Sequence, residues 1–143
     1  MYKNEFDNYL KQNKKFKAYM FYGQSIFLVE QYALVIAQSL GNDDEIEKLY
    51  FEEYDFKYTK DKLLQSSLFS SNNIILIKLD KKIPKKEVDS LIEACNLNPD
   101  STLIFACLGD SDFKTMEASF SLKTNSAAVR FFLPTDTEAI KFL

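Results

Sequence analysis

The first stretch that could do chemistry is the end of an apolar run, 18–22, which stops at Gly23. A phosphate-binding loop of the form GxxxxGK[ST] surrounds phosphates with backbone amides, neutralises them with lysine and holds magnesium with a hydroxyl. Counted from Gly23, Leu28 and Val29 occupy the places of the second glycine and the lysine. Leu28 blocks close approach of the backbone and no cation replaces the lysine. We therefore expect no working nucleotide site.

A second stretch that could do chemistry ends at Asp80, which follows the apolar run 74–79. This arrangement resembles a strand that ends in a magnesium-associated carboxylate. The next residue is Lys81, where an ATPase of this type would usually carry the glutamate that activates water. A lone aspartate at a strand end is more often a turn residue, and 109–112 has ordinary turn chemistry as well. We expect no catalytic residue, no bound metal and no cofactor.

Composition limits the class of protein further. The 143 residues suit one domain, with a net charge of −3 and no histidine. A domain that grips DNA through phosphates usually has a basic face, so tight DNA binding is not expected. Cys95 and Cys107 lie in apolar surroundings without a CxxC pair, which indicates buried thiols. The sequence lacks an apolar run of membrane-spanning length, and we predict a soluble, cytoplasmic protein.

The most unusual local feature is the segment Gln-Ser-Ser-Leu-Phe at 65–69, after a short predicted helix. Leu64 and Leu68 are four apart and could share a core-facing stripe, so spacing alone favours a core role for Leu68 and Phe69. The other interpretation is an exposed anchor. Leucine and phenylalanine at a helix tip can fill a partner's hydrophobic pocket while polar neighbours set the orientation.

Helices and apolar strands alternate along the chain. Ser25 is the expected N-cap of the second helix and Gly41 its expected C-cap. Strands buried on both faces need helices above and below, which predicts an α/β fold with a mostly parallel five-stranded sheet flanked by helices. The predicted strands are 18–22, 49–54, 74–79, 102–108 and 128–132, and the predicted helices are 2–13, 25–40, 59–66, 84–97 and 113–123.

The last residues suggest a domain boundary. Thr135 to Glu138 resembles a capping box that opens a new helix. The apolar residues that follow have nothing ahead to pack on. We expect 1–134 to form one domain, and 135–143 to begin a helix that leads into a further domain.

Several short motifs, taken in their order, resemble the delta subunit of the bacterial DNA polymerase III clamp loader. A strand ends in Tyr22-Gly23, a helix takes the place of a phosphate loop, and a later helix closes in Ser-Leu-Phe at 67–69. An apolar strand at 74–79 and the exit Phe-Phe-Leu-Pro at 131–134 complete the pattern. The segment at 65–69 also resembles the QxxLF-type peptide with which many bacterial proteins dock on the sliding clamp.

The resemblance implies a fold and a function. The fold would be an AAA+ ATPase module (a P-loop NTPase fold) with a degenerate nucleotide site. The domain would bind the beta sliding clamp and help to open the ring during DNA replication, as a non-catalytic part of the DNA polymerase III holoenzyme, a DNA-directed DNA polymerase. The implied clamp-binding residues are Gln65, Ser66, Ser67, Leu68 and Phe69.

The resemblance also implies partners, and two other functions compete with it. Other clamp-loader subunits, gamma/tau and delta prime, would be contacted mainly through a further C-terminal part, and DNA only through the assembled complex. One alternative is a P-loop-like nucleotide hydrolase or kinase with an unusual loop. Another is a general adaptor domain that uses an exposed helix for a different protein. Nucleotide titration and clamp titration separate the three.

Overall fold

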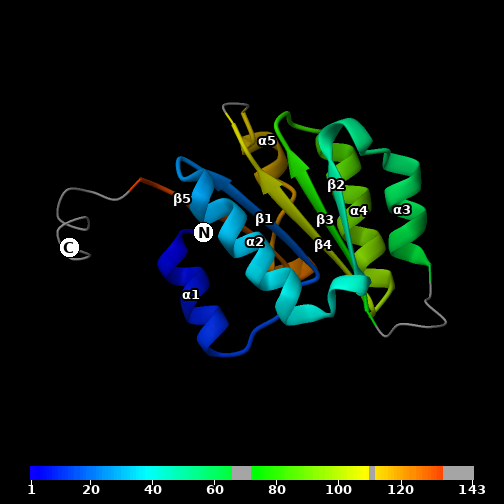
Figure 1. The fold of residues 1–143 in the computed structure, drawn as a ribbon, viewed down its shortest axis with the longest axis horizontal. Coiled ribbons are helices and arrows are strands. Elements are labelled where there is room, and N and C mark those ends of the chain that lie inside the picture. Colours follow the sequence, from blue (N-terminus) through cyan, green and yellow to red (C-terminus); the bar gives the residue numbers. More distant parts are fainter. Residues whose placement is uncertain (66–71, 110–111, 134–143) are drawn as a thin grey trace.

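The computed structural model describes residues 1–65, 72–109 and 112–133. Its centre is a five-stranded sheet in the order β2-β3-β4-β1-β5, and every pairing is parallel (Figure 1). The sheet therefore confirms the predicted α/β class. The strands are β1 (Ala18–Gly23), β2 (Ile46–Tyr50), β3 (Asn73–Leu79), β4 (Ser101–Cys107) and β5 (Ser126–Phe131).

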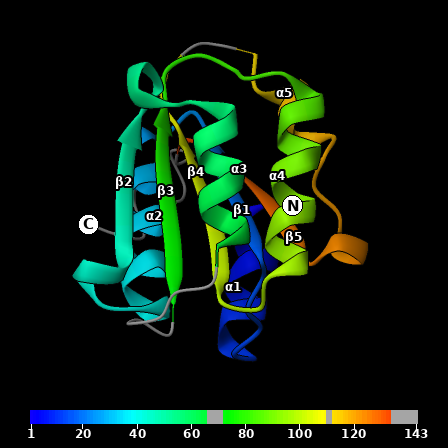
Figure 2. The ribbon, with the colours of Figure 1, turned by 90° about the vertical axis from the view of Figure 1, so that its right-hand side faces the viewer.

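Helices cover both faces of this sheet, as its buried strands require. One face carries α1 (Lys3–Lys11) and α2 (Ile26–Leu40). The other carries α3 (Phe56–Leu64), α4 (Lys85–Leu97) and the short α5 (Lys114–Glu117), as Figure 2 shows. Parallel strands need such crossover connections, and the helices provide them.

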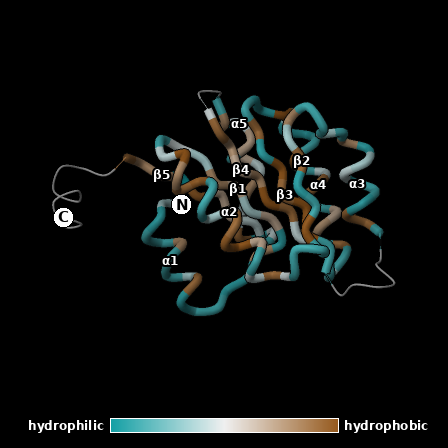
Figure 3. The backbone as a smooth tube through the Cα atoms, in the orientation of Figure 1, coloured by the Kyte–Doolittle hydropathy of each residue, from teal (hydrophilic) through white to brown (hydrophobic). Residues whose placement is uncertain are grey.

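The sheet separates two hydrophobic cores because successive strand side chains point to opposite faces. Met20 and Phe105 pack toward α3 and α4, whereas Tyr19 and Ile104 pack toward α1 and α2. Apolar residues accordingly follow the strands through the middle of the molecule (Figure 3). The α1–α2 side is rich in aromatic contacts around Phe6, which is fully buried.

Several predicted boundaries are wrong, among them those of the second strand and of the fifth helix. The second strand ends at Tyr50, because the Glu53 side chain accepts from the Tyr50 backbone N–H at 3.0 Å and the chain turns into a 3₁₀ helix. Helix α5 ends at Glu117 instead of continuing to residue 123, and Ser121 caps a separate 3₁₀ turn. By contrast, α2 ends at Leu40 and Gly41 is its C-cap as predicted, with extended backbone at φ −173°.

The two cysteines are buried as predicted. Cys95 is 0 % exposed and Cys107 is 2 % exposed. Burial raises the pKa of Cys95 to about 12 and raises the pKa of Cys107 as well. At pH 8 both thiols are therefore protonated, and the nucleophilic thiolate is scarce.

We expect native protein at pH 8 to react with a disulfide reagent such as DTNB many times more slowly than protein unfolded in urea. Both cysteines should react in the unfolded chain. The measurement is the release of thionitrobenzoate with time. Fast modification of either thiol in the native protein would contradict this packing.

The described part of the chain shows neither a membrane-spanning helix nor a cluster of metal ligands. None of its helices is long and apolar enough to cross a membrane. Among the described residues, the cysteine, aspartate and glutamate side chains do not gather in a group that could hold a metal ion. The predicted domain boundary at 134–135 lies outside the described residues.

Candidate protein-docking site

The turn from β1 to α2 is occupied by contacts within the protein. Gly23 has φ +128°, and a Cβ built there would lie 2.1 Å from the Phe131 backbone oxygen. The Gln24 N–H donates to that same oxygen at 2.9 Å, and the Gln24 side chain accepts from the Leu133 N–H. Glycine is thus required at residue 23 because β5 passes so close to β1.

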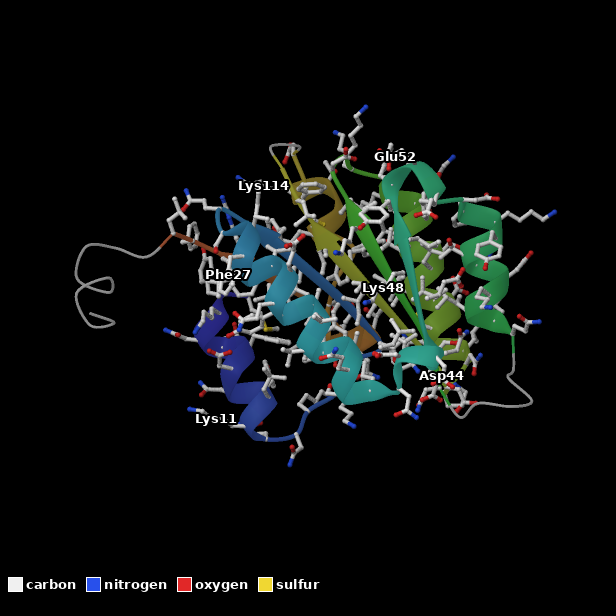
Figure 4. All side chains as sticks on the ribbon, viewed as in Figure 1. Lys11, Phe27, Asp44, Lys48, Glu52 and Lys114 are labelled. Atoms are coloured by element: carbon white, nitrogen blue, oxygen red, sulfur yellow. The ribbon has the colours of Figure 1, made fainter. Side chains whose placement is uncertain are left out.

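Helix α2 begins three residues after this glycine, at Ile26. Ser25 is its N-cap, as predicted, and the hydroxyl accepts from the Leu28 N–H at 3.2 Å. Val29, at the place of the phosphate-binding lysine, is 0 % exposed and points into the core. Exposed apolar side chains begin the helix, among them Phe27 at 72 % (Figure 4).

Two charged positions near the carboxyl edge of the sheet also differ from a nucleotide site. Glu30 stands at the place of the magnesium-binding hydroxyl, and it lies 4.0 Å from the Lys78 amine. Lys81 stands where an ATPase of this type would usually carry the water-activating glutamate, and its amine lies 5.9 Å from the centre of the Phe51 ring. A glutamate beside bound phosphates would repel them, so this arrangement gives phosphate little attraction.

The helix that precedes the candidate docking segment is firmly packed. Asp55 caps α3 by accepting from the Lys57 N–H, and Thr59 and Leu63 are both 0 % exposed. Leu64 is 41 % exposed. The prediction that Leu64 lies on a core-facing stripe is therefore wrong, because the inward face of α3 is formed four residues apart by Thr59 and Leu63.

Of the five predicted clamp-binding residues, the structure describes only Gln65. It is exposed, has extended backbone with φ −81° and ψ 128°, and ends α3. Ser66, Ser67, Leu68 and Phe69 lie outside the described residues.

The chain enters the next strand at Asn73, on the edge of the sheet where the strands begin. Gly23 ends β1 at the opposite edge. The six residues of a strand span about 20 Å, so Asn73, which follows the docking candidate in sequence, and Gly23 lie at opposite ends of the sheet.

The far side of the segment is also tied to the scaffold. The Asn72 N–H donates to Glu45 Oε2 at 3.0 Å, and Glu45 Oε1 accepts from the Asn42 N–H at 2.9 Å. The Asn73 N–H donates to the Asp100 carbonyl oxygen at 2.8 Å. At the other end, the Gln65 carbonyl oxygen accepts from the Asn98 amide at 3.2 Å, so both ends of the 65–72 connection are held by hydrogen bonds to other elements.

Three polar residues beneath the end of α3 could not be identified from sequence, namely Asn73, Asn98 and Ser101. All three are buried and bond to α3 carbonyl oxygens or to one another. The only local signal was the polar residue that begins β3 and β4, Asn73 and Ser101, whereas Asn98 follows α4 and begins no strand. That pattern is common at strand ends and does not indicate which contacts form.

The chain resembles known proteins both in sequence and in structure. Two curated proteins of Helicobacter pylori, from strains J99 and 26695, are 29 % and 27 % identical over the whole chain, which covers 47 % of each. The chain thus spans about half the length of these relatives.

Solved structures share the fold. The DNA clamp loader delta protein of Bacillus subtilis has a TM-score of 0.69 at 15 % identity, with 97 % of this chain and 45 % of that chain covered. A gamma subunit-related protein of DNA polymerase III from Thermotoga maritima has a TM-score of 0.54 at 7 % identity, with 93 % and 47 % covered. The family model described as DNA polymerase III, delta subunit, matches residues 19–132, and the chain therefore belongs to the DNA polymerase III delta subunit family.

Proposed function

We propose that this chain is the sliding-clamp-binding domain of a clamp loader, and that it acts in DNA replication by contact instead of by catalysis. Family membership supports the loader role. The observation that carries the clamp contact is the position of 65–69. The Gln-Ser-Ser-Leu-Phe sequence begins where α3 stops, between two flanks that are hydrogen-bonded to the scaffold.

In this proposal Leu68 and Phe69 enter a hydrophobic pocket on one protomer of the beta clamp, and Gln65 orients the segment. Burying the two apolar side chains contributes roughly 3–5 kcal/mol before association costs are subtracted. A fixed starting direction lowers those costs because less conformational freedom is lost on binding.

In this proposal the domain helps to open the ring by binding one state of the clamp more tightly than the other, without hydrolysing ATP. A ligand shifts an equilibrium only by its difference in affinity for the two states, so the domain must bind the open or strained clamp better than the closed one. ATP acts in other clamp-loader subunits of the gamma/tau type, with delta prime as a further neighbour, and DNA is reached through the assembly.

The proposal excludes ATP hydrolysis by this domain. The supporting geometry is the β1–α2 turn, where Gly23 is closed off by Phe131 and Val29 is buried. We expect titration with ATP and magnesium to give no saturable signal up to about 1 mM, a concentration that detects even binding of about 4 kcal/mol.

Isothermal titration or fluorescence of a labelled nucleotide makes this measurement. Clamp added afterwards to the same sample should bind, which shows that the protein is active. Saturable magnesium-dependent ATP binding would contradict the non-catalytic role and favour the nucleotide hydrolase.

The direct test of the clamp contact is a titration of the 143-residue chain against the beta clamp of the same organism. We expect a saturable complex that an excess of a Gln-Ser-Ser-Leu-Phe peptide displaces. A chain that binds the clamp equally well in the presence of that peptide would contradict the proposed contact.

A further inference from the structure

The last turn of α3 is held by a buried polar junction, which we define as Asn73, Asn98 and Ser101. The Asn73 amide donates to the Lys62 carbonyl oxygen at 2.6 Å. The Ser101 hydroxyl donates to the Leu63 carbonyl oxygen at 2.6 Å and accepts from the Asn73 amide at 3.2 Å. These contacts join α3 to the first residues of β3 and β4.

Asn98 makes the contacts nearest to the docking segment. Its amide donates to the carbonyl oxygens of Leu63 at 2.9 Å and Gln65 at 3.2 Å. Its own oxygen accepts from the Asp100 N–H at 3.1 Å. Both donors and the acceptor of this 7 % exposed side chain are thus in use, which fixes its orientation.

The junction replaces an ordinary helix ending. The last carbonyls of a helix lack intrahelical partners and are often satisfied around a glycine in left-handed conformation. Here Gln65 is extended instead, and the buried polar junction donates hydrogen bonds to the last carbonyl oxygens of the helix. The direction in which the chain leaves α3 is therefore set by tertiary contacts and not by local sequence.

A lysine next to β1 fixes the loop that carries Asn98. The Lys17 amine donates to the carbonyl oxygens of Asn98 and Pro99, each at 3.0 Å. Lys17 directly precedes β1, and the Leu103 N–H donates to its carbonyl oxygen at 3.1 Å. Asn98 is thus anchored to the strands as well as to the end of α3.

We propose that Asn98, supported by Ser101 and Asn73, is a positioning residue for clamp binding. By holding the Gln65 carbonyl, it fixes the direction from which the chain starts toward Leu68 and Phe69. This inference rests on the proposed function of that pair. Loss of the hold increases the number of directions available to the segment, and more entropy is then lost when the clamp binds.

The substitution Asn98→Asp tests this role because it keeps the shape and the acceptor for Asp100 but removes both N–H donors. The matched control is Asn96→Asp. Asn96 also donates to two carbonyl oxygens, those of Ile92 at 3.1 Å and Thr124 at 2.7 Å, and lies on α4 away from the end of α3. Both variants add the same charge.

We expect Asn98→Asp to weaken clamp binding about five- to tenfold and Asn96→Asp to change it less than about twofold. In free protein, amide hydrogen exchange of the peptide that contains Gln65 should accelerate in Asn98→Asp alone. With Leu68→Ala already present, Asn98→Asp should weaken binding by a much smaller factor, because less of the anchor remains to be positioned.

A second pair of variants controls for loss of stability. Ser101→Ala removes a buried bond at the end of α3, whereas Thr59→Val removes the buried bond from the Thr59 hydroxyl to the Asp55 carbonyl oxygen, 2.8 Å long, at its start. Clamp affinity should fall in Ser101→Ala only. Equal losses in both variants would show that α3 stability alone matters and would overturn the inference.

The outcomes separate this inference from the proposed function. Clamp binding that requires Leu68 and Phe69 but ignores Asn98→Asp would overturn the positioning role and leave the docking role standing. Binding that ignores Leu68→Ala/Phe69→Ala would overturn both. Equal effects of Asn98→Asp with and without Leu68→Ala would also overturn positioning, because the residue would then act independently of the segment.

Discussion

Replacing Leu68 and Phe69 together with alanine is expected to weaken binding to the beta clamp by at least about 2 kcal/mol, or roughly thirtyfold. The two side chains are the apolar anchors of the proposed interface. Truncating such anchors removes the area they bury while the surrounding polar contacts contribute little. The measurement is a clamp titration with parent and variant at the same salt concentration.

A matched pair on another surface provides the control. Phe27 is 72 % exposed and Leu34 is 39 % exposed, and both lie on α2. The variant Phe27→Ala/Leu34→Ala removes the same side-chain types from the surface, so a general loss of hydrophobic adhesion would appear in it too. We expect its clamp affinity to stay within about twofold of the parent.

Two results would contradict the anchor role. Unchanged affinity of Leu68→Ala/Phe69→Ala would leave the segment without a docking function. Loss of the cooperative unfolding transition in the same variant, by circular dichroism, would return both residues to the hydrophobic core.

The second large effect concerns the glycine at the end of β1. We expect Gly23→Ala to lower the free energy of unfolding by about 3–4 kcal/mol. A Cβ at this position would lie 2.1 Å from the Phe131 oxygen and 2.7 Å from its nitrogen, and φ of +128° is strained for alanine. Both atoms belong to the backbone of β5, so relief requires the strand to move. Urea unfolding measures the loss.

Gly109 separates the two causes. Its φ is +106°, but the nearest atom to an added Cβ is the Asp80 oxygen at 3.8 Å. Gly109→Ala therefore has the strain without the clash, and we expect a loss of about 1 kcal/mol. Equal losses at Gly23 and Gly109 would show that the approach of β5 to β1 does not determine the glycine.

The surroundings of Gly23 bear on the function of the β1–α2 turn as well as on stability. A glycine kept for a phosphate has open space around its Cα when nucleotide is absent. Gly23 instead faces the backbone of β5, and the Gln24 N–H is bonded to the Phe131 oxygen. Its presence is explained by strand packing, and a nucleotide is not needed to account for it.

The sheet could be predicted from sequence because its inner strands are continuous apolar runs. All seven residues of β4 are buried, and such runs require cover on both faces. The edge strand β2 was harder to place because only Leu49 of its five residues is buried. Its polar neighbours Glu47 and Lys48 hide the start of the strand, and the prediction therefore began too late.

The candidate site likewise has a part that could be predicted from sequence and a part that could not. The apolar pair at residues 68 and 69 could be singled out because the segment at 65–69 resembles a clamp-docking peptide, although spacing alone favours a core role. The support from Asn98 is not visible, because this residue is 33 positions from Gln65 and meets it only in the folded chain. Hydrogen bonds between distant residues follow from topology, which no local pattern encodes.

The most direct test of the central claim is hydrogen–deuterium exchange of the chain with and without the beta clamp. The account predicts that slowed exchange centres on residues 64–72, that α2 is unaffected, and that Leu68→Ala/Phe69→Ala removes the effect. Protection centred on another surface, or none in the segment at a clamp concentration that saturates the chain, would contradict it.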